Sequence, residues 1–274
     1  MTPNTDAWIA YDPHHRPQRA WRMAGSAPQS AALRVDNVAA AQALGPGDAL
    51  WSTDAGQQAA VPVPAKPSEL PVLTQSDGAE NIFSMADLEQ ARPFGRLAGA
   101  AFRIEGFLSL NKDWDGVICL PGFHATHWAQ ISADEVVSFL SFSTLALVEA
   151  LCPVETEAAT VDESALTATL ADVLSTPETL ALRMAETKAR WSVGTLSDDS
   201  AAGQIWGAAL AAELAASRSY WLGQNLALIS PAALARPYRA ALASQYVPVT
   251  EADESRMTLH GLSRARARWI KARS

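Results

Sequence analysis

A polar loop near the start of this 274-residue chain combines side chains that bind metals or anions. Residues 12–17 read Asp-Pro-His-His-Arg-Pro and directly follow the apolar run Ala7–Tyr11. Imidazole nitrogens together with a carboxylate are ligands for divalent transition metals. Histidine and arginine side chains also bind anions such as carboxylates or phosphates. The residue types in this loop leave both chemistries open.

A second loop of the same kind lies near the middle of the chain. Residues 117–120 form a short, β-branched apolar run that predicts a buried strand, and Pro121-Gly122 ends it. The loop that follows carries His124, Thr126 and His127. A strand, a sharp turn and a polar loop form the arrangement with which α/β proteins present chemistry at the carboxyl end of a strand. We therefore expect functional residues in this loop.

Motifs of several common enzyme classes are absent from the sequence. It contains no Gly-x-Gly-x-x-Gly or phosphate-binding Walker sequence, and no Gly-x-Ser-x-Gly elbow. Asp113 and Asp115 flank Trp114 and resemble a pair of catalytic carboxylates, but a polar turn before the strand is the simpler interpretation. The chemistry must therefore be sought in the two loops.

The composition is that of a globular protein whose length suits one large domain or two lobes. Apolar residues make up 49% of the chain, and the net charge of −8 excludes a broad phosphate-neutralising surface for nucleic acid. Two cysteines form no disulfide framework, and no apolar run approaches the roughly 20 residues that cross a bilayer. The first residues show no signal peptide, so we expect a cytoplasmic protein without a membrane partner.

The elements that must position the loops are strands in the first half of the chain. Ala7–Tyr11 and Arg19–Met23 predict a hairpin, and Asn37 is placed to cap a short helix that ends near Leu44. Recurring prolines predict an extended segment over residues 61–71. A short helix capped by Ser84 is expected over residues 85–91, while residues 92–110 are ambiguous between helix and loop.

The second half alternates strands with helices. Strands are expected at residues 117–120, 128–131, 136–142, 226–229 and 246–249, and helices at residues 144–151, 164–175, 177–190, 198–220, 231–244 and 254–271. Such alternation argues for an α/β architecture in which helices cover a sheet.

Short pieces along nearly the whole chain resemble the 2-dehydro-3-deoxygalactonokinase family in their order and spacing. The pieces are Ile9–Asp12 with Arg19–Trp21, Arg103 with Glu105, Pro121-Gly122 with His124 and Trp128, Val193–Leu196, Gly207 with Glu213, Leu234 with Tyr238 and Ala241-Leu242, and His260–Leu262. Each piece is short, and their common order carries the resemblance.

The resemblance implies an α/β protein with the two-lobed, actin-like (ribonuclease H-like) fold, in which each lobe is a mixed sheet flanked by helices. The expected lobes are an N-terminal one, residues 1–110, and a C-terminal one, residues 111–274. The implied activity is that of a transferase, a kinase of sugar acid metabolism. It phosphorylates a 2-keto-3-deoxy sugar acid, with ATP and Mg²⁺ as cofactors.

The resemblance also implies roles for individual residues. Asp12 is the expected catalytic residue, either as a ligand of the metal ion or as a general base. Arg103, Glu105 and His124 are expected at the substrate. The expected nucleotide-side residues are Thr126, Gly194, Thr195 and Ser230.

The loops depart from the family pattern where phosphate should bind. The family's first loop reads Asp-Trp-Gly-Ser/Thr-Thr/Ser, but here Pro13 and Pro17 carry no N–H, and imidazoles replace the small residues. The family's second loop, Pro-Gly-Thr-His-Ser-Lys-Trp, becomes residues 121–128, which are one residue longer, have Phe123 in place of the threonine and lack the lysine. Four further family segments are also altered, at Glu105-Gly106, residues 144–146, residues 229–231 and residues 52–58. We therefore predict a pseudokinase, weak or inactive in phosphorylation.

The implied fold places the two histidine loops face to face, which leads to a second hypothesis for the site. His14, His15 and His127 would then hold a metal, or would bind an anion together with Arg16. In the alternative interpretation, the histidines fill a solvated cleft and make ordinary hydrogen bonds.

Three functions therefore remain open: an impaired sugar-acid kinase, a non-catalytic protein that binds a sugar acid, small anion or metal, and a structural or interaction protein that uses the cleft. The sequence predicts no nucleic-acid partner and does not specify the oligomeric state.

Overall fold

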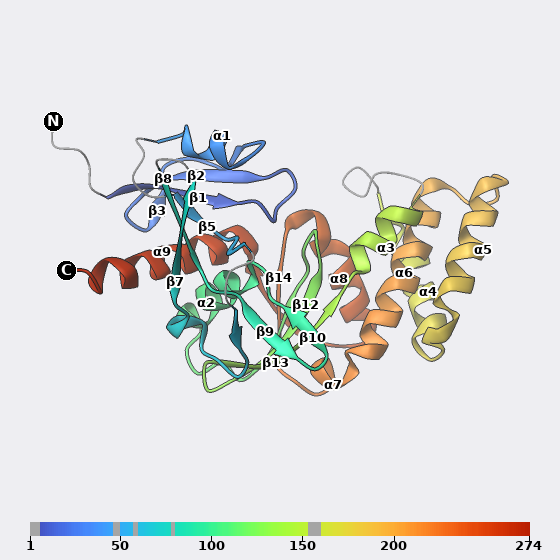
Figure 1. Cartoon of the computed structure of the whole chain (residues 1–274). Coiled ribbons are helices and arrows are strands. Elements are labelled where there is room, and N and C mark those ends of the chain that lie inside the picture. The colour runs from blue at the N-terminus through green and yellow to red at the C-terminus, as the bar shows by residue number, and fades with distance from the viewer. Residues whose placement is uncertain (1–5, 46–49, 57–59, 78–79, 153–159) are drawn as a thin grey trace. The chain divides into compact units, whose positions relative to one another are not determined.

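The structure is a computed structural model that describes residues 6–45, 50–56, 60–77, 80–152 and 160–274 (Figure 1). The chain divides into two compact units, neither of them continuous in sequence. Unit 1 comprises Met1–Asp115, Gln130–Phe139 and Ala252–Ser274, and unit 2 comprises Gly116–Ala129 and Leu140–Glu251. Among the described residues, no helix is both long and apolar enough to cross a membrane.

The larger sheet of unit 1 has the strand order β3-β2-β1-β5-β8-β7, with β4 paired to β2. Its strands are β1 (Ala7–Asp12), β2 (Arg19–Ala24), β3 (Ala27–Pro28), β4 (Leu33–Arg34), β5 (Leu50–Ser52), β7 (Val72–Asp77) and β8 (Glu80–Met85). The predicted hairpin is confirmed, since β1 pairs antiparallel with β2 and places Asp12 opposite Arg19. Strand β5 runs parallel to β1, and the sequence leads directly from its end to Thr53.

The smaller sheet of unit 1 corrects one prediction. Its order is β10-β9-β6, formed by β10 (Phe94–Arg96), β9 (Leu88–Ala91) and β6 (Val61–Pro62). The helix expected over residues 85–91 is wrong: Leu88 and Gln90 are buried while Ala91 is exposed, which is the alternation of a strand. Ser84 does not cap a helix, because its hydroxyl donates to the carbonyl of Met85. This segment is a strand because it pairs with β6 and β10, and the local sequence alone does not reveal that pairing.

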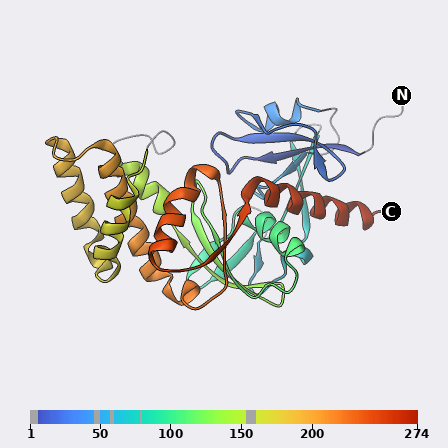
Figure 2. The same ribbon diagram turned by 180° about the vertical axis from the view of Figure 1, so that it is seen from behind.

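The helices of unit 1 are α1 (Val38–Gln42), the 3-10 helix η1 (Pro67–Glu69), α2 (Ala100–Leu110) and α9 (Glu254–Lys271). The predicted cap of α1 is confirmed, since the Asn37 side chain accepts a hydrogen bond from the Ala40 amide. The ambiguous segment 92–110 resolves into β10 and α2, separated by Gly99 in a left-handed conformation. Helix α9 lies beside α2 (Figure 2).

Unit 2 contributes β11 (Gly116–Leu120), β14 (Leu226–Ser230) and most of β15 (Val249–Asp253) to a sheet of order β13-β12-β11-β14-β15. The remaining strands, β12 (Thr126–Ser132) and β13 (Glu135–Phe142), cover the strands predicted over residues 128–131 and 136–142, and their residues 130–139 group with unit 1. Strands β11 and β14 are parallel, with Cys119 opposite Leu228. Their carboxyl ends therefore lie at one edge of the sheet.

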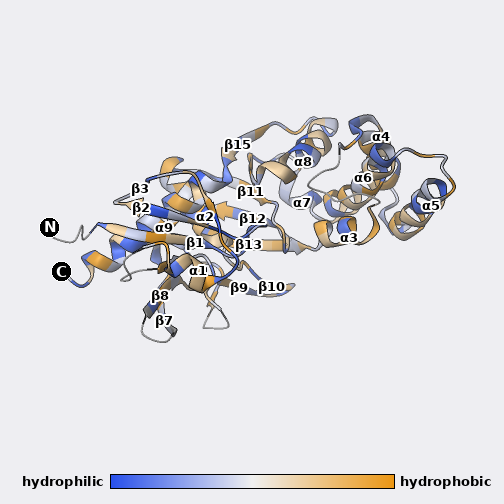
Figure 3. Ribbon diagram, turned by 90° about the horizontal axis from the view of Figure 1, so that it is seen from above, coloured by the Kyte–Doolittle hydropathy of each residue, from blue (hydrophilic) through white to orange (hydrophobic). Residues whose placement is uncertain are grey.

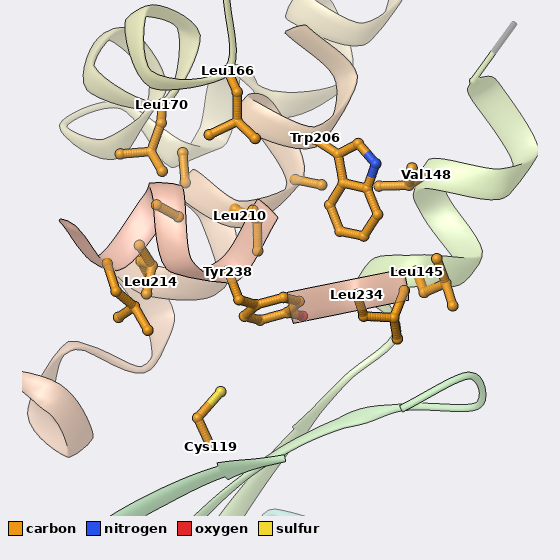
Figure 4. Close-up of a cluster of buried hydrophobic side chains, with 14 of the residues drawn as sticks. Cys119, Leu145, Val148, Leu166, Leu170, Trp206, Leu210, Leu214, Leu234 and Tyr238 are labelled. Carbon is orange, nitrogen blue, oxygen red and sulfur yellow. The ribbon is translucent and has the colours of Figure 1, made fainter. Parts of the chain in front are cut away.

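The helices of unit 2 are α3 (Thr144–Leu151), α4 (Glu163–Leu174), the 3-10 helix η2 (Pro177–Thr179), α5 (Leu180–Ser192), α6 (Asp198–Ala216), α7 (Arg218–Trp221) and α8 (Ala232–Ser244). Their colouring by hydropathy is mixed along each helix, as expected of helices that bury only part of their surface (Figure 3). The buried parts form a core with Trp206, Leu210 and Tyr238 (Figure 4). The mixed α/β architecture with sheets flanked by helices confirms the predicted fold class.

Candidate functional site

Asp12 lies at the end of β1 and is buried, with 4% of its surface exposed. Its Oδ1 accepts hydrogen bonds from the Thr53 hydroxyl at 2.9 Å and the His14 amide at 3.2 Å. Its Oδ2 accepts from Arg19 Nη2 at 2.9 Å and Nε at 3.2 Å. A carboxylate offers about four acceptor positions, and the protein fills them. We call Asp12, His14, Arg19 and Thr53 the Asp12 cluster.

Positive charges keep Asp12 ionised. Burial by itself would raise the pKa of Asp12, but the charges of Arg19, His14 and Arg103, with the hydrogen bond from Thr53, outweigh burial and hold that pKa below its usual value. Arg19 also donates to Glu254 and, at 2.8 Å, to the Ser255 hydroxyl. One guanidinium thus contacts two buried carboxylates, that of Asp12 at the end of β1 and that of Glu254 at the first position of α9.

The His14 ring packs against the turn that begins α2. A Cβ added to Gly99 would lie 2.5 Å from Cδ2 of His14 and 3.2 Å from the Thr53 carbonyl oxygen. A larger residue at this position would force the His14 ring to shift, and the φ of +68° is one that side chains disfavour. The imidazole of this loop therefore lies between the loop, which the resemblance assigns to phosphate, and the start of α2.

Asp87 is a second buried carboxyl in unit 1, and sequence reasoning did not single it out. Burial raises the pKa of Asp87 to about 6, although the Arg96 charge and the Gly99 amide favour its ionised form. Arg96 Nη2 lies 3.3 Å from Asp87 Oδ2. The available signal was an acid between the apolar residues Ala86 and Leu88.

The two predicted substrate residues of α2 have different partners. Arg103 acts electrostatically on Asp12. Glu105, 2% exposed, instead accepts hydrogen bonds at Oε1 from Arg264 Nε at 2.7 Å and Arg268 Nη1 at 2.8 Å. Two positions along a helix correspond to about 200°, so the side chains leave the helix on opposite sides. The partners described above therefore differ, with Asp12 near Arg103 and two arginines of α9 bound to Glu105.

In unit 2 the edge formed by the carboxyl ends of β11 and β14 holds several predicted residues. The loop with exposed His124 follows β11, and Ser230, whose hydroxyl donates to the Pro231 carbonyl, ends β14. Thr126 is buried, and its hydroxyl lies 2.5 Å from the Tyr238 hydroxyl. The edge of a parallel pair is where α/β proteins bind ligands, but the Thr126 hydroxyl is engaged inside the unit.

Beneath this edge lies a buried acid, Glu213 of α6, which the sequence analysis used only as a point of resemblance. Its Oε1 accepts from Trp128 Nε1 at 2.8 Å, and its Oε2 from the Tyr238 hydroxyl at 3.0 Å and from the Thr144 hydroxyl. Burial raises the pKa of Glu213 to about 7, against the effect of these hydrogen bonds. A glutamate within the alanine-rich stretch 208–216 was the signal for a buried acid.

The remaining predicted residues show local contacts. His15 Nδ1 lies 3.0 Å from the Pro17 carbonyl oxygen, and buried His127 has Nδ1 2.8 Å from the Ser141 hydroxyl. Gly194 and Thr195 follow α5, and the Thr195 amide and hydroxyl both donate to the Arg190 carbonyl. This is the geometry of a helix C-cap. Within the described ranges, no three His, Cys, Asp or Glu side chains lie close enough together to hold a metal ion.

A model of a known protein family matches most of this chain. The family model of 2-keto-3-deoxy-galactonokinase matches residues 53–265, which is more than half of the chain. None of the curated proteins compared with this chain matches it in sequence.

Solved structures give the same fold. A Sinorhizobium meliloti protein assigned as a 2-dehydro-3-deoxygalactonokinase superimposes with a TM-score of 0.82 over 96% of this chain and 97% of its own, at 19% identity. The activator of the 2-hydroxyisocaproyl-CoA dehydratase from Clostridium difficile, with bound ADPNP, superimposes with a TM-score of 0.55 over 97% of both chains, at 9% identity. The similarity extends beyond the short pieces found in the sequence, and the chain belongs to the 2-keto-3-deoxy-galactonokinase family.

Proposed function

We propose that this protein binds a sugar acid of the family's substrate class and phosphorylates it weakly or not at all. The proposal rests on one observation, that hydrogen-bond donors of the protein occupy all acceptor positions of the Asp12 carboxylate. Thr53, the His14 amide and Arg19 together fill the acceptor positions of its carboxylate. A Mg²⁺ ion at Asp12 would have to displace at least one of these donors.

The loop after Asp12 supports the same conclusion. Phosphate cradles use successive backbone N–H groups, and Pro13 and Pro17 have none. The His14 ring packs against Gly99, beside this loop. The residues in unit 1 therefore do not fit Mg²⁺ and nucleotide phosphates at Asp12, and we assign Asp12 a structural role.

Binding of the acid follows from family membership, since the family is named for a kinase of 2-keto-3-deoxy-galactonate. Arg103 and His124 remain the proposed contacts of the acid. ATP and Mg²⁺ are cofactors only if phosphorylation remains.

The test combines calorimetric titration with 2-keto-3-deoxy-galactonate and a coupled assay of ADP release in the presence of Mg-ATP. We expect saturable binding of the acid and no ADP release above the rate without acid. Acid-dependent ADP release that Asp12→Asn abolishes, in a variant whose circular dichroism remains native, would overturn the assignment of Asp12. Absence of acid binding would instead favour the alternative of a structural or interaction protein.

Asp172→Asn is the matched control, because this acid is exposed on α4 of unit 2. It should leave both the binding heat and the background ADP release unchanged.

A further inference from the structure

Unit 1 contains a cavity of about 400 Å³ that neither Arg103 nor His124, the proposed contacts of the sugar acid, lines. It lies at the C-terminal end of α2 and is lined by Glu105 and Ser109 of that helix, Lys112 and Asp113 of the following turn, Asp134 of the β12–β13 turn and Arg264 of α9. Its volume lies within the range of small-molecule sites, roughly 300–1,000 Å³. The walls combine carboxylates, cations and two serine hydroxyls, those of Ser68 and Ser109.

A buried carboxylate anchors the cavity. The side chain of Glu105 is 3% exposed, and both of its hydrogen bonds from described residues, those of Arg264 and Arg268, reach Oε1. Oε2 accepts no hydrogen bond from the residues that the structure describes. A carboxylate oxygen in a lined cavity, with its partner oxygen fixed by two guanidinium groups, is a preorganised acceptor for a cation or a hydroxyl.

The remaining charges of the cavity include both signs. Arg264 uses Nε for Glu105, so the forked end of its guanidinium is available to a carboxylate. Lys112, Asp113 and Asp134 form no salt bridge with any described residue. Asp113 and Asp134 would repel a ligand with only a negative charge. Lys112 and Arg264 would repel a ligand with only a positive charge.

We propose that this cavity binds a small zwitterion, an α-amino acid, with its ammonium group toward Glu105 Oε2 and the two aspartates and its carboxylate toward Lys112 and Arg264. Such a ligand satisfies charges of both signs while adding no net charge. The site is independent of sugar-acid binding, because it uses neither Asp12 nor Arg103.

The experiment is calorimetric titration of the full chain with each of the common L-amino acids in turn. For the tightest binder, the amine that lacks the carboxylate and the acid that lacks the amine are titrated as well. We expect saturable binding of at least one amino acid, weakened about tenfold or more when either ligand group is removed. Failure of all of them to bind, or equal binding of the deaminated acid, would overturn the proposal.

Variants locate the binding site. Asp113→Asn and Lys112→Met should each weaken binding about tenfold. Asparagine retains the shape of Asp113, whose φ of 58° asparagine also tolerates. Exposed Asp36 and Lys188 do not line the cavity, so Asp36→Asn and Lys188→Met serve as controls. Binding that is indifferent to both cavity variants would contradict the proposed site.

Discussion

Arg19 is the residue whose contacts define the Asp12 cluster. Its guanidinium lies between the carboxylates of Asp12 and Glu254, and all three side chains are at most 8% exposed. It also lies 4.8 Å from the ring centre of Trp21. A buried cation between two acids is costly to remove, since each acid is then left without its main counter-charge.

We predict that Arg19→Met lowers the free energy of unfolding by about 3–5 kcal/mol, because two buried carboxylates lose their shared partner. Urea unfolding followed by tryptophan fluorescence measures this loss. The control is Arg183→Met, whose partner Glu186 lies 3.4 Å away with both side chains 43% exposed. That pair should contribute less than about 1 kcal/mol. Equal losses in the two variants would show that the Asp12 cluster does not stabilise unit 1.

A second prediction concerns Glu213. Between about pH 4.5 and pH 7 the folded protein keeps the proton on Glu213 while the unfolded chain releases it, so the free energy of unfolding falls as the pH rises. The loss from this group should reach about 3 kcal/mol by pH 8. Glu213→Gln should fold and should remove this part of the pH dependence, since its amide oxygen can accept from Trp128 Nε1 while its amide N–H groups donate to the hydroxyl oxygens of Tyr238 and Thr144, as a protonated carboxyl does.

Urea unfolding of the wild type and Glu213→Gln at several pH values between 5 and 8 measures the difference. Glu178→Gln, at an exposed acid of the same unit, should retain the wild-type pH dependence. An unchanged slope in Glu213→Gln would show that this acid is ionised in the folded state. The pKa of Asp87 is also raised, to about 6. In both proteins this acid should therefore lower the free energy of unfolding further as the pH rises toward 6.

At the scale of elements, glycines at a helix contact allow two helices to pack closely in both units. In unit 1, a Cβ at Gly106 of α2 would lie 2.0 Å from the Met257 carbonyl oxygen, and one at Gly261 of α9 would lie 2.0 Å from that of Phe102. In unit 2, a Cβ at Gly207 of α6 would lie 2.3 Å from the Leu166 carbonyl oxygen of α4. The close α2–α9 contact helps to fix the helices that carry Arg103, Glu105 and Arg264.

Gly106→Ala should therefore destabilise the protein, although alanine favours an isolated helix by about 1 kcal/mol. The added methyl group forces α2 and α9 apart, and we expect a net loss of about 1–3 kcal/mol, as for overpacked cores. Thermal unfolding measures the effect. Ala267→Ser, on the exposed side of α9, is the control and should change stability by less than about 1 kcal/mol. A stabilised Gly106→Ala protein would contradict the close helix approach.

At the scale of the whole molecule, ligand binding connects the proposed function to stability. A ligand that binds only the folded state raises the free energy of unfolding by about 2.7 kcal/mol at a concentration of 100 Kd. For a chain of this length, that corresponds to a rise in Tm of several degrees. We predict such a rise with 2-keto-3-deoxy-galactonate and a smaller one with Mg-ATP, because the Asp12 cluster does not fit metal and phosphate. A larger rise with Mg-ATP than with the acid would refute this prediction.

The sequence by itself determined the family, the hairpin of β1 and β2, the cap at Asn37 and the alternation of helices and strands in the second half. These features depend on local patterns: apolar periodicity, turn residues and capping side chains. The wrong helix over residues 85–91 shows the limit of such patterns, because strand β9 exists through its partners β6 and β10.

Only the tertiary structure decided the roles of the charged residues. Asp12 and Glu254 are 242 positions apart yet share Arg19, and Glu105 is paired with arginines near the C-terminus. The pKa values of Asp87 and Glu213 are raised by burial, and the extent of that burial depends on tertiary packing. The sequence identified which acids and cations are present, and the packing of distant segments determined which of them are already satisfied by the protein.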